Sequence, residues 1–257
     1  MKTLLALLLL SPLCSLAQSF SVGIDPRVKA ELRKFSDGGN ALPDSYVEAL
    51  PRTILSKMTA EKRSHLSRVN SGAGCAPTTS VTFLKAGDLL GSRGQGAADA
   101  DAIDEFESGM IRIEALGCMR GEHASEALDL VNQPAFQLSV VSELKSSQIL
   151  GGLTCDRTSV TGLGSSEYCY TSLSRKTPGL AWTFTQNVTN APVSQASAPV
   201  YFRSIFMTFT EKNGVTYGHT IAYVRGPKIP GILRGVGRSR ISSTQARSFV
   251  ELERRLK

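Results

Sequence analysis

The sequence predicts an α+β fold in which helices pack on an antiparallel β-sheet. Five segments in its second half are rich in β-branched and aromatic residues, as strands usually are: 137–150, 166–174, 180–188, 200–210 and 215–225. Lys212-Asn213-Gly214 separates the last two, and Asn-Gly readily adopts the positive φ angles of a hairpin turn. Strands joined by hairpins are antiparallel. Helical patterns precede and follow the strands, so one face of the sheet should be buried against helices.

Residues 25–70 have the pattern of amphipathic helices. Asp25-Pro26 provides a cap and a first-turn proline, a second segment begins at Pro43, and Thr59 can begin a third. We expect Pro51 to bend or divide the second segment. Glycine-rich loops or linkers follow at 71–77 and 91–98, with one strand around residues 81–83 between them.

Later helices are predicted on either side of the strand-rich region. A strand at 110–116 leads into a helix from Glu122 to Asn132, which Pro134 should end. A terminal helix should begin at Ser242 or Ser243, with Phe249 among its apolar positions.

The first 17 residues have the three parts of a secretory leader. Lys2 gives a positive start, Leu4 to Leu10 is an apolar run, and Ser15-Leu16-Ala17 is a small-residue cleavage site. The run is shorter than the ~20 residues of a membrane anchor. Cys14 raises the alternative of a lipoprotein, which we disfavour because Ser11-Pro12-Leu13 lacks the small residue that this processing requires. We therefore expect a protein that is exported to the periplasm or secreted.

Cleavage would leave four cysteines, an even number that favours two disulfides in an oxidising compartment. Three pairings are possible in principle. We favour Cys155–Cys169, which are close in sequence, and this leaves Cys75–Cys118. Metal-ligand spacings are missing from the sequence, so we expect no metal site.

The formal charge of +7 arises in the last part of the chain. After residue 224 two glutamates oppose nine basic residues: Arg225, Lys228, Arg234, Arg238, Arg240, Arg247, Arg254, Arg255 and Lys257. Such a region attracts anions, although it also serves simply to keep a protein soluble. In an exported protein the available anions are envelope polymers or a membrane surface rather than nucleic acid. We take Arg234, Arg238 and Arg240 as the candidate contacts.

The order of elements from residue 109 onward resembles the helix-grip fold of the START-like superfamily. The resemblance rests on the 110–113 strand before the Glu122 helix, the 144–150 strand, and Ile229-Pro230 between the last strand and the last helix. It implies a curved sheet gripping the terminal helix around an apolar cavity, with a lipid or another apolar ligand inside. Two expected disulfides and about 90 additional N-terminal residues depart from the family pattern, and a sandwich or barrel is the alternative fold.

Four parts follow from these patterns: a leader (1–17), an N-terminal helical segment (18–75), a strand with a Gly-rich linker (76–108), and a START-like α+β domain (109–257).

Catalytic and cofactor motifs are missing from the sequence. There is no Gly-x-Ser-x-Gly elbow, and the Gly-rich stretch fits neither a phosphate loop nor a dinucleotide fingerprint. We therefore favour a binding protein without cofactor over an enzyme, and an anion-binding surface protein is the second hypothesis. The candidate cavity residues are rings on neighbouring strands, which core packing would use equally: Trp182, Phe184, Phe202, Phe206, Tyr217, His219 and Tyr223.

Overall fold

An eight-stranded antiparallel sheet forms the centre of the fold. The computed structural model describes residues 26–35, 41–71, 77–160, 164–189, 200–226 and 229–257. The strands lie in the order β1-β2-β8-β7-β6-β5-β4-β3, and each pairs antiparallel with its neighbours. Their bounds are β1 Thr78–Phe83, β2 Met110–Arg120, β3 Leu144–Leu150, β4 Leu153–Val160, β5 Gly164–Thr177, β6 Leu180–Thr189, β7 Phe202–Lys212 and β8 Val215–Arg225. This confirms the α+β expectation.

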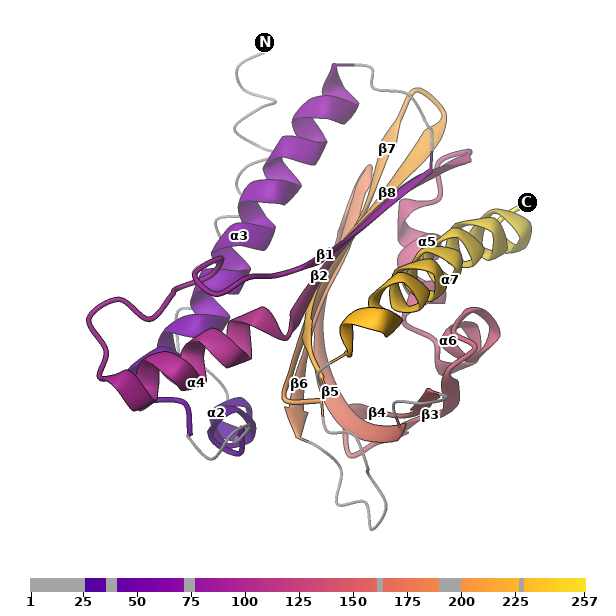
Figure 1. The fold of residues 1–257 in the computed structure, drawn as a ribbon. Coiled ribbons are helices and arrows are strands. Elements are labelled where there is room, and N and C mark those ends of the chain that lie inside the picture. Colours follow the sequence, from indigo (N-terminus) through magenta and orange to yellow (C-terminus); the bar gives the residue numbers. More distant parts are fainter. Residues whose placement is uncertain (1–25, 36–40, 72–76, 161–163, 190–199, 227–228) are drawn as a thin grey trace.

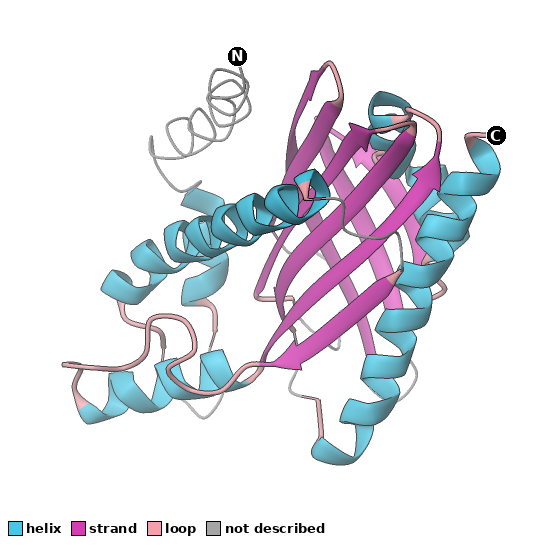
Figure 2. Cartoon of the chain, turned by 90° about the horizontal axis from the view of Figure 1, so that it is seen from above, coloured by secondary structure: helices cyan, strands magenta, loops and turns pink. Residues whose placement is uncertain are grey.

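Helices cover both faces of the sheet (Figures 1 and 2). One face packs against α2 (Pro26–Arg33), α3 (Asp44–Asn70) and α4 (Ala97–Ser108). The other packs against α5 (Ala124–Val131), α6 (Pro134–Val140) and α7 (Arg234–Arg255), which follows a short 3-10 turn, Gly231–Leu233. The β6–β3 part of the sheet curls round beneath α6 and α7 (Figure 1), so the sheet grips the terminal helix. We call this the inner face, and the face toward α3 the outer face.

Each central strand contributes to both cores because successive side chains point to opposite faces. On β7, Phe202 and Phe206 belong to the core with α2, α3 and α4, whereas Phe209 belongs to the core with α5, α6 and α7. The central strands therefore bury side chains on both of their faces.

Two facing glycines allow α7 to lie directly on the sheet. Gly117 of β2 pairs with Gly218 of β8. A Cβ atom at Gly117 would lie 2.5 Å from the Phe249 ring, and one at Gly218 would lie 2.4 Å from it. Any larger side chain at either position would displace Phe249.

Several elements differ from the sequence-based expectation. Helix α3 continues through Pro51 because one face of the helix is buried, including Val47, Leu50 and Ile54, so packing offsets the lost hydrogen bond. Segment 137–150 is the end of α6 followed by β3. The polar strand β4 has no hydrophobic pattern of its own and is held by pairing with β3 and β5.

Two further helices are longer than their local patterns indicated. Helix α4 occupies the second part of the stretch expected as a strand and linker, where the acidic run 99–107 lies. Helix α7 begins at Arg234, eight residues before Ser242, although Gly235 and Gly237 weaken its first turns.

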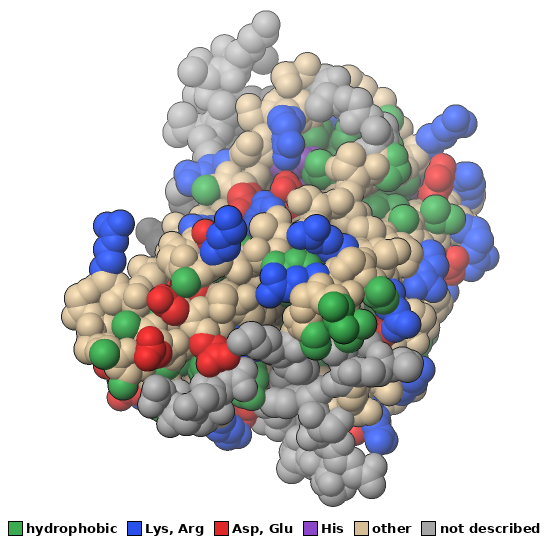
Figure 3. Space-filling view, viewed as in Figure 1, with side chains coloured by type: hydrophobic (Ala, Val, Ile, Leu, Met, Phe, Trp, Pro, Cys, Tyr) green, Lys and Arg blue, Asp and Glu red, His purple; other side chains and the backbone are tan. Residues whose placement is uncertain are grey.

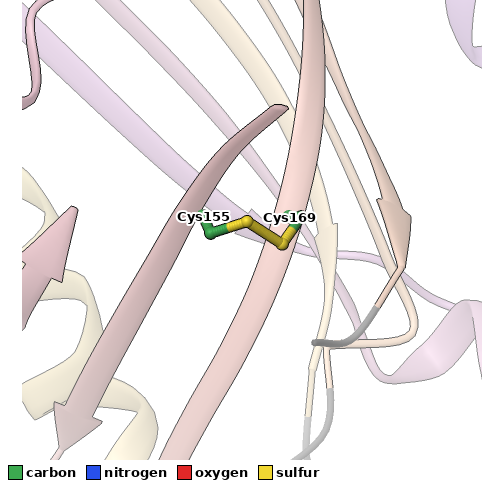
Figure 4. The surroundings of a disulfide bond; sticks show 2 residues. All are labelled: Cys155 and Cys169. Carbon is green, nitrogen blue, oxygen red and sulfur yellow. A yellow bond between two sulfur atoms is a disulfide. The ribbon is translucent and has the colours of Figure 1, made fainter. Parts of the chain in front are cut away.

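A disulfide joins Cys155 of β4 to Cys169 of β5, as predicted (Figure 4). The two residues face each other in the register of the strand pair. Cys118 lies on β2, and Cys75, its expected partner, lies outside the described residues. The second pairing stays a prediction.

Gly218→Ala tests the contact between α7 and the sheet. We expect a loss of about 1–3 kcal/mol in the free energy of unfolding, because the new methyl group would overlap Phe249. Urea unfolding measures the change. Gly226→Ala is the matched control, since a Cβ atom there meets nothing within 4 Å. Equal stability of the two variants would show that α7 does not depend on this contact.

Candidate functional site

A cavity of about 330 Å³ lies between the inner face of the sheet and helices α6 and α7. Phe136 of α6, Phe209 of β7 and Phe249 of α7 contribute aromatic walls. Aliphatic side chains complete most of the lining: Ile113, Val131, Val140, Val141, Leu144, Ile205, Met207, Ile229, Ile241 and Leu252. An apolar cavity with a few polar groups is typical of small-molecule binding sites.

Arg203 is the main polar feature of this cavity. Alternation along β7 directs Arg203, Ile205, Met207 and Phe209 to the inner face. The Arg203 guanidinium lies 4.7 Å from the centre of the Tyr170 ring and 5.3 Å from that of Tyr168. Both distances are within the range of cation–π attraction.

One nitrogen of Arg203 has no hydrogen-bond partner in the described structure. This atom, Nη1, is buried, although a buried guanidinium nitrogen normally donates a hydrogen bond. The Arg203 side chain remains charged at every physiological pH. A positive charge with a free donor therefore lies against the cavity.

Asp156 of β4 lines the same end of the cavity. Its carboxyl is 5% exposed, and Oδ1 also has no hydrogen-bond partner among the described residues. Burial raises the pKa of this carboxyl, and the charge of Arg203 offsets part of that effect. Burial raises the pKa of the Tyr170 hydroxyl to about 12, so this hydroxyl is neutral and can donate a hydrogen bond. We call Arg203, Asp156, Tyr168 and Tyr170 the polar end of the cavity; the first three line the cavity, and Tyr170 lines the hollow next to it.

A second hollow of about 190 Å³ adjoins the polar end. It is lined by Arg203 and Tyr170 together with small polar residues: Thr154, Ser172, Thr183 and Thr185. Arg203 lines both hollows, so it lies between the apolar cavity and a more polar space.

The mouth of the apolar cavity is at the start of α7. Arg240 lines the cavity, while its side chain is 47% exposed to solvent. Ile229, Gly237 and Ile241 line the cavity from the same segment. The first turns of α7 therefore separate the cavity from solvent.

The seven residues expected to line a cavity lie elsewhere. The five rings Trp182, Phe184, Phe202, Phe206 and Tyr223 are in the core with α2, α3 and α4, on the outer face. Trp182 and Phe184 pack edge-on against Phe206, with ring centres 5.8 and 6.4 Å apart. Alternation on β8 places Tyr217 and His219 on this outer face with Tyr223. The cavity between the inner face and helices α6 and α7 is lined by other residues.

The three arginines that were predicted to contact anions lie near two different residues. Arg234 and Arg238 stack on Phe83 of β1 at 5.0 and 5.4 Å, and Arg240 lies at the cavity mouth, 3.9 Å from Glu143. The four residues of the polar end were not predicted. The sequence contained one indication of this polar end, because Arg203 is a charged residue within the mostly apolar segment from Val200 to Phe206.

His219 belongs to a buried polar layer beneath α3. Its ring lies 4.3 Å from that of His65, and its Nε2 lies 3.1 Å from a carboxylate oxygen of Glu114. Burial lowers the pKa of His65 to about 2, the neighbouring His219, Lys62 and Arg68 act in the same direction, and Glu114 opposes them. Burial likewise lowers the pKa of His219. His219 is separated from the cavity by the sheet, so the structure gives no support to His219 as a catalytic group of that cavity.

Lys62 of α3 places a buried amine in this layer. Its side chain is 1% exposed, and its Nζ has no hydrogen-bond partner in the described structure. Burial lowers the pKa of the amine well below its usual range. The amine therefore remains buried at the expense of stability.

Two kinds of feature are missing from the described ranges: a cluster of metal-binding side chains and a membrane-spanning helix. Histidine, cysteine and carboxylate side chains there form no group of three that could hold a metal ion. Among the helices of those ranges, none is both long enough and apolar enough to span a bilayer.

Comparisons with known proteins find similar structures but no similar sequences. Neither a family model nor a curated protein matches the chain. A STAR-related lipid transfer protein fragment from Xanthomonas axonopodis is 11% identical, covering 58% of this chain and 93% of its own, with a TM-score of 0.45. Human StAR-related lipid transfer protein 5 is 13% identical, covering 77% and 94%, with a TM-score of 0.44.

A START superfamily protein from Mycobacterium smegmatis is 10% identical to this chain. It covers 56% of this chain and 97% of its own, with a TM-score of 0.42. The chain is thus similar to START-superfamily structures at low identity and over part of its length. The strand order and the position of α7 show the helix-grip arrangement directly.

Lys62→Met tests the buried amine. Burial lowers the pKa of Lys62, so below pH ~10.5 the unfolded chain binds more protons at this residue than the folded chain, and native stability falls as the pH decreases. We expect the variant to gain about 1–3 kcal/mol at pH 7, and more at pH 6 than at pH 9.

Urea unfolding at these three pH values measures the gain. Arg63→Met, an exposed position on the same helix, is the control and should change stability by less than about 0.5 kcal/mol. If Lys62→Met is instead less stable than the wild type, a group bound to the wild-type protein accepts a hydrogen bond from the amine.

Proposed function

We propose that this chain is an exported, non-enzymatic binding protein that holds one small amphipathic ligand between its sheet and α7. The observation that carries the proposal is an apolar cavity lined by an arginine whose Nη1 atom is buried and lacks a hydrogen-bond partner in the described structure. Its volume of about 330 Å³ is at the lower end of the range for ligand pockets, which is roughly 300–1,000 Å³. One single-chain molecule suits this space better than a lipid with two long chains.

The apolar walls would supply most of the affinity. Each methylene group that moves from water into such a cavity contributes about 0.8 kcal/mol. The rings of Phe136, Phe209 and Phe249 are held by α6, β7 and α7, so the walls are formed before a ligand arrives. A preformed site does not require further ordering of side chains on binding.

The polar end favours an anionic head group, such as a carboxylate. A buried charge without a partner is costly, and the two tyrosine rings offset only part of this cost. A ligand carboxylate would accept a hydrogen bond from Arg203 Nη1 and place opposite charges together. Burial raises the pKa of Asp156, so this carboxyl takes up a proton more readily than in water and, when protonated, would donate a further hydrogen bond.

The lining of the cavity supports binding rather than catalysis. Among the described residues that line it there is no histidine and no cysteine. A serine, Ser248, lies there without a neighbouring base that would activate it. Export remains part of the proposal, motivated by the N-terminal leader pattern, which lies outside the described residues.

Dodecanoate and methyl dodecanoate test the cavity and its polar end together. We expect native mass spectrometry to detect one bound dodecanoate, and saturation at about 100 times its Kd to raise Tm by about 5–10 °C. Arg203→Met should weaken dodecanoate binding about tenfold or more and leave the ester nearly unaffected, because only the acid uses the guanidinium.

Arg240→Met is the matched control, because Arg240 also lines the cavity but is half-exposed at its mouth. It should change the affinity for dodecanoate by less than about threefold. If no fatty acid, ester or phospholipid binds or stabilises the protein, the proposed function is wrong.

A further inference from the structure

Two aliphatic side chains project into solvent at the start of the terminal helix. Ile232 is 89% exposed and Val236 is 52% exposed. Ile232 lies in the 3-10 turn Gly231–Leu233, and Val236 lies in the first turn of α7, which follows directly. Figure 3 shows hydrophobic and basic side chains side by side over this part of the molecule. We call Ile232, Val236, Arg234, Arg238 and Arg240 the α7 entry surface.

The arginines of this surface have little negative charge around them. Arg234 and Arg238 stack on Phe83, and neither has an ion-pair partner in the described parts of the chain. Arg240 is 3.9 Å from Glu143, a weak contact. The sequence from Arg234 to Val250 contains four arginines and no acidic residue.

Their position in the helix is also unfavourable for the isolated protein. The N-terminus of a helix carries partial positive charge, which repels cations in the first turns. Helix α7 has no acidic residue in its first turn and begins with Arg234. An external anionic surface would relieve this repulsion.

The α7 entry surface adjoins the cavity mouth. Gly237, Arg240 and Ile241 line the cavity from the same turns that expose Val236 on the outside. Gly235 and Gly237 also lower the cost of distorting these turns, since glycine in a helix is less favourable than alanine by about 1 kcal/mol. Contact at this surface can therefore act on the segment that closes the cavity.

We propose that the α7 entry surface docks on an anionic lipid membrane. Ile232 and Val236 enter the boundary between head groups and acyl chains, and the arginines contact lipid phosphates. A hydrated polyanion would use the arginines but would gain nothing from exposed aliphatic side chains. The combination of both, at the mouth of an apolar cavity, fits a lipid surface. Docking in itself does not require that the cavity holds a ligand.

Vesicle co-sedimentation with the purified protein tests docking. The vesicles are phosphatidylcholine alone, or an equal mixture of phosphatidylcholine and phosphatidylglycerol. We expect at least about tenfold stronger partition to the anionic mixture. The double variant Ile232→Ser/Val236→Ser should reduce this partition about tenfold or more, because it removes two inserted aliphatic groups.

Val250→Ser is the matched control, since Val250 is 68% exposed near the other end of α7 and should not affect partition. The double variant changes only exposed positions, and circular dichroism checks that it remains folded. Dextran sulfate provides the polyanion comparison.

Two results would overturn the proposal. One is the absence of binding to either vesicle. The other is equal binding of the wild type and the double variant to anionic vesicles, together with tight binding of both to dextran sulfate, which would show a polyanion-binding surface. Ligand binding by the double variant, measured with dodecanoate, reports on the cavity separately, so failure of docking and failure of the proposed function are distinguishable.

Discussion

Phe249 lies against Gly117 and Gly218, which face each other across β2 and β8, and the position of α7 depends on this contact. The two glycines remove the side chains that would otherwise separate helix from sheet. Helix α7 is therefore in direct contact with the sheet at Phe249, and its first turns lie against β1, where Arg234 and Arg238 stack on Phe83. The cavity is the space left between this contact and the curled strands.

The sheet contributes side chains to two hydrophobic cores, one on each face. This explains which predictions from the sequence were right and which were not. The strands at 180–188, 200–210 and 215–225 were predicted well because their β-branched and aromatic residues are buried on both faces. The Asn213-Gly214 turn has positive φ angles of 53° and 73°, as its residue types indicated. Alternation distinguishes two faces, but it does not show which one adjoins a cavity, so Trp182 and its neighbours were placed on the ligand side without physical grounds to choose.

Other features depend on tertiary context that no local pattern contains. Strand β4 consists largely of polar residues, yet it carries Asp156, and its pairing partners alone make it a strand. The polar end combines residues from β4, β5 and β7, so only the folded sheet brings them together. Arg203 was visible in the sequence as a charge near apolar residues, but its stacking on the rings of Tyr168 and Tyr170 was not.

The Cys155–Cys169 disulfide has a consequence for the inner face, although the bond itself is on the outer face. Its cysteines are sequence neighbours of Asp156 and Tyr168, which alternation directs into the cavity. A slip of β4 by one residue relative to β5 would turn Asp156 to the outer face, away from Tyr168 and the cavity. The bond fixes this alignment covalently, so it holds Asp156 and Tyr168 side by side on the inner face as well as joining the two strands.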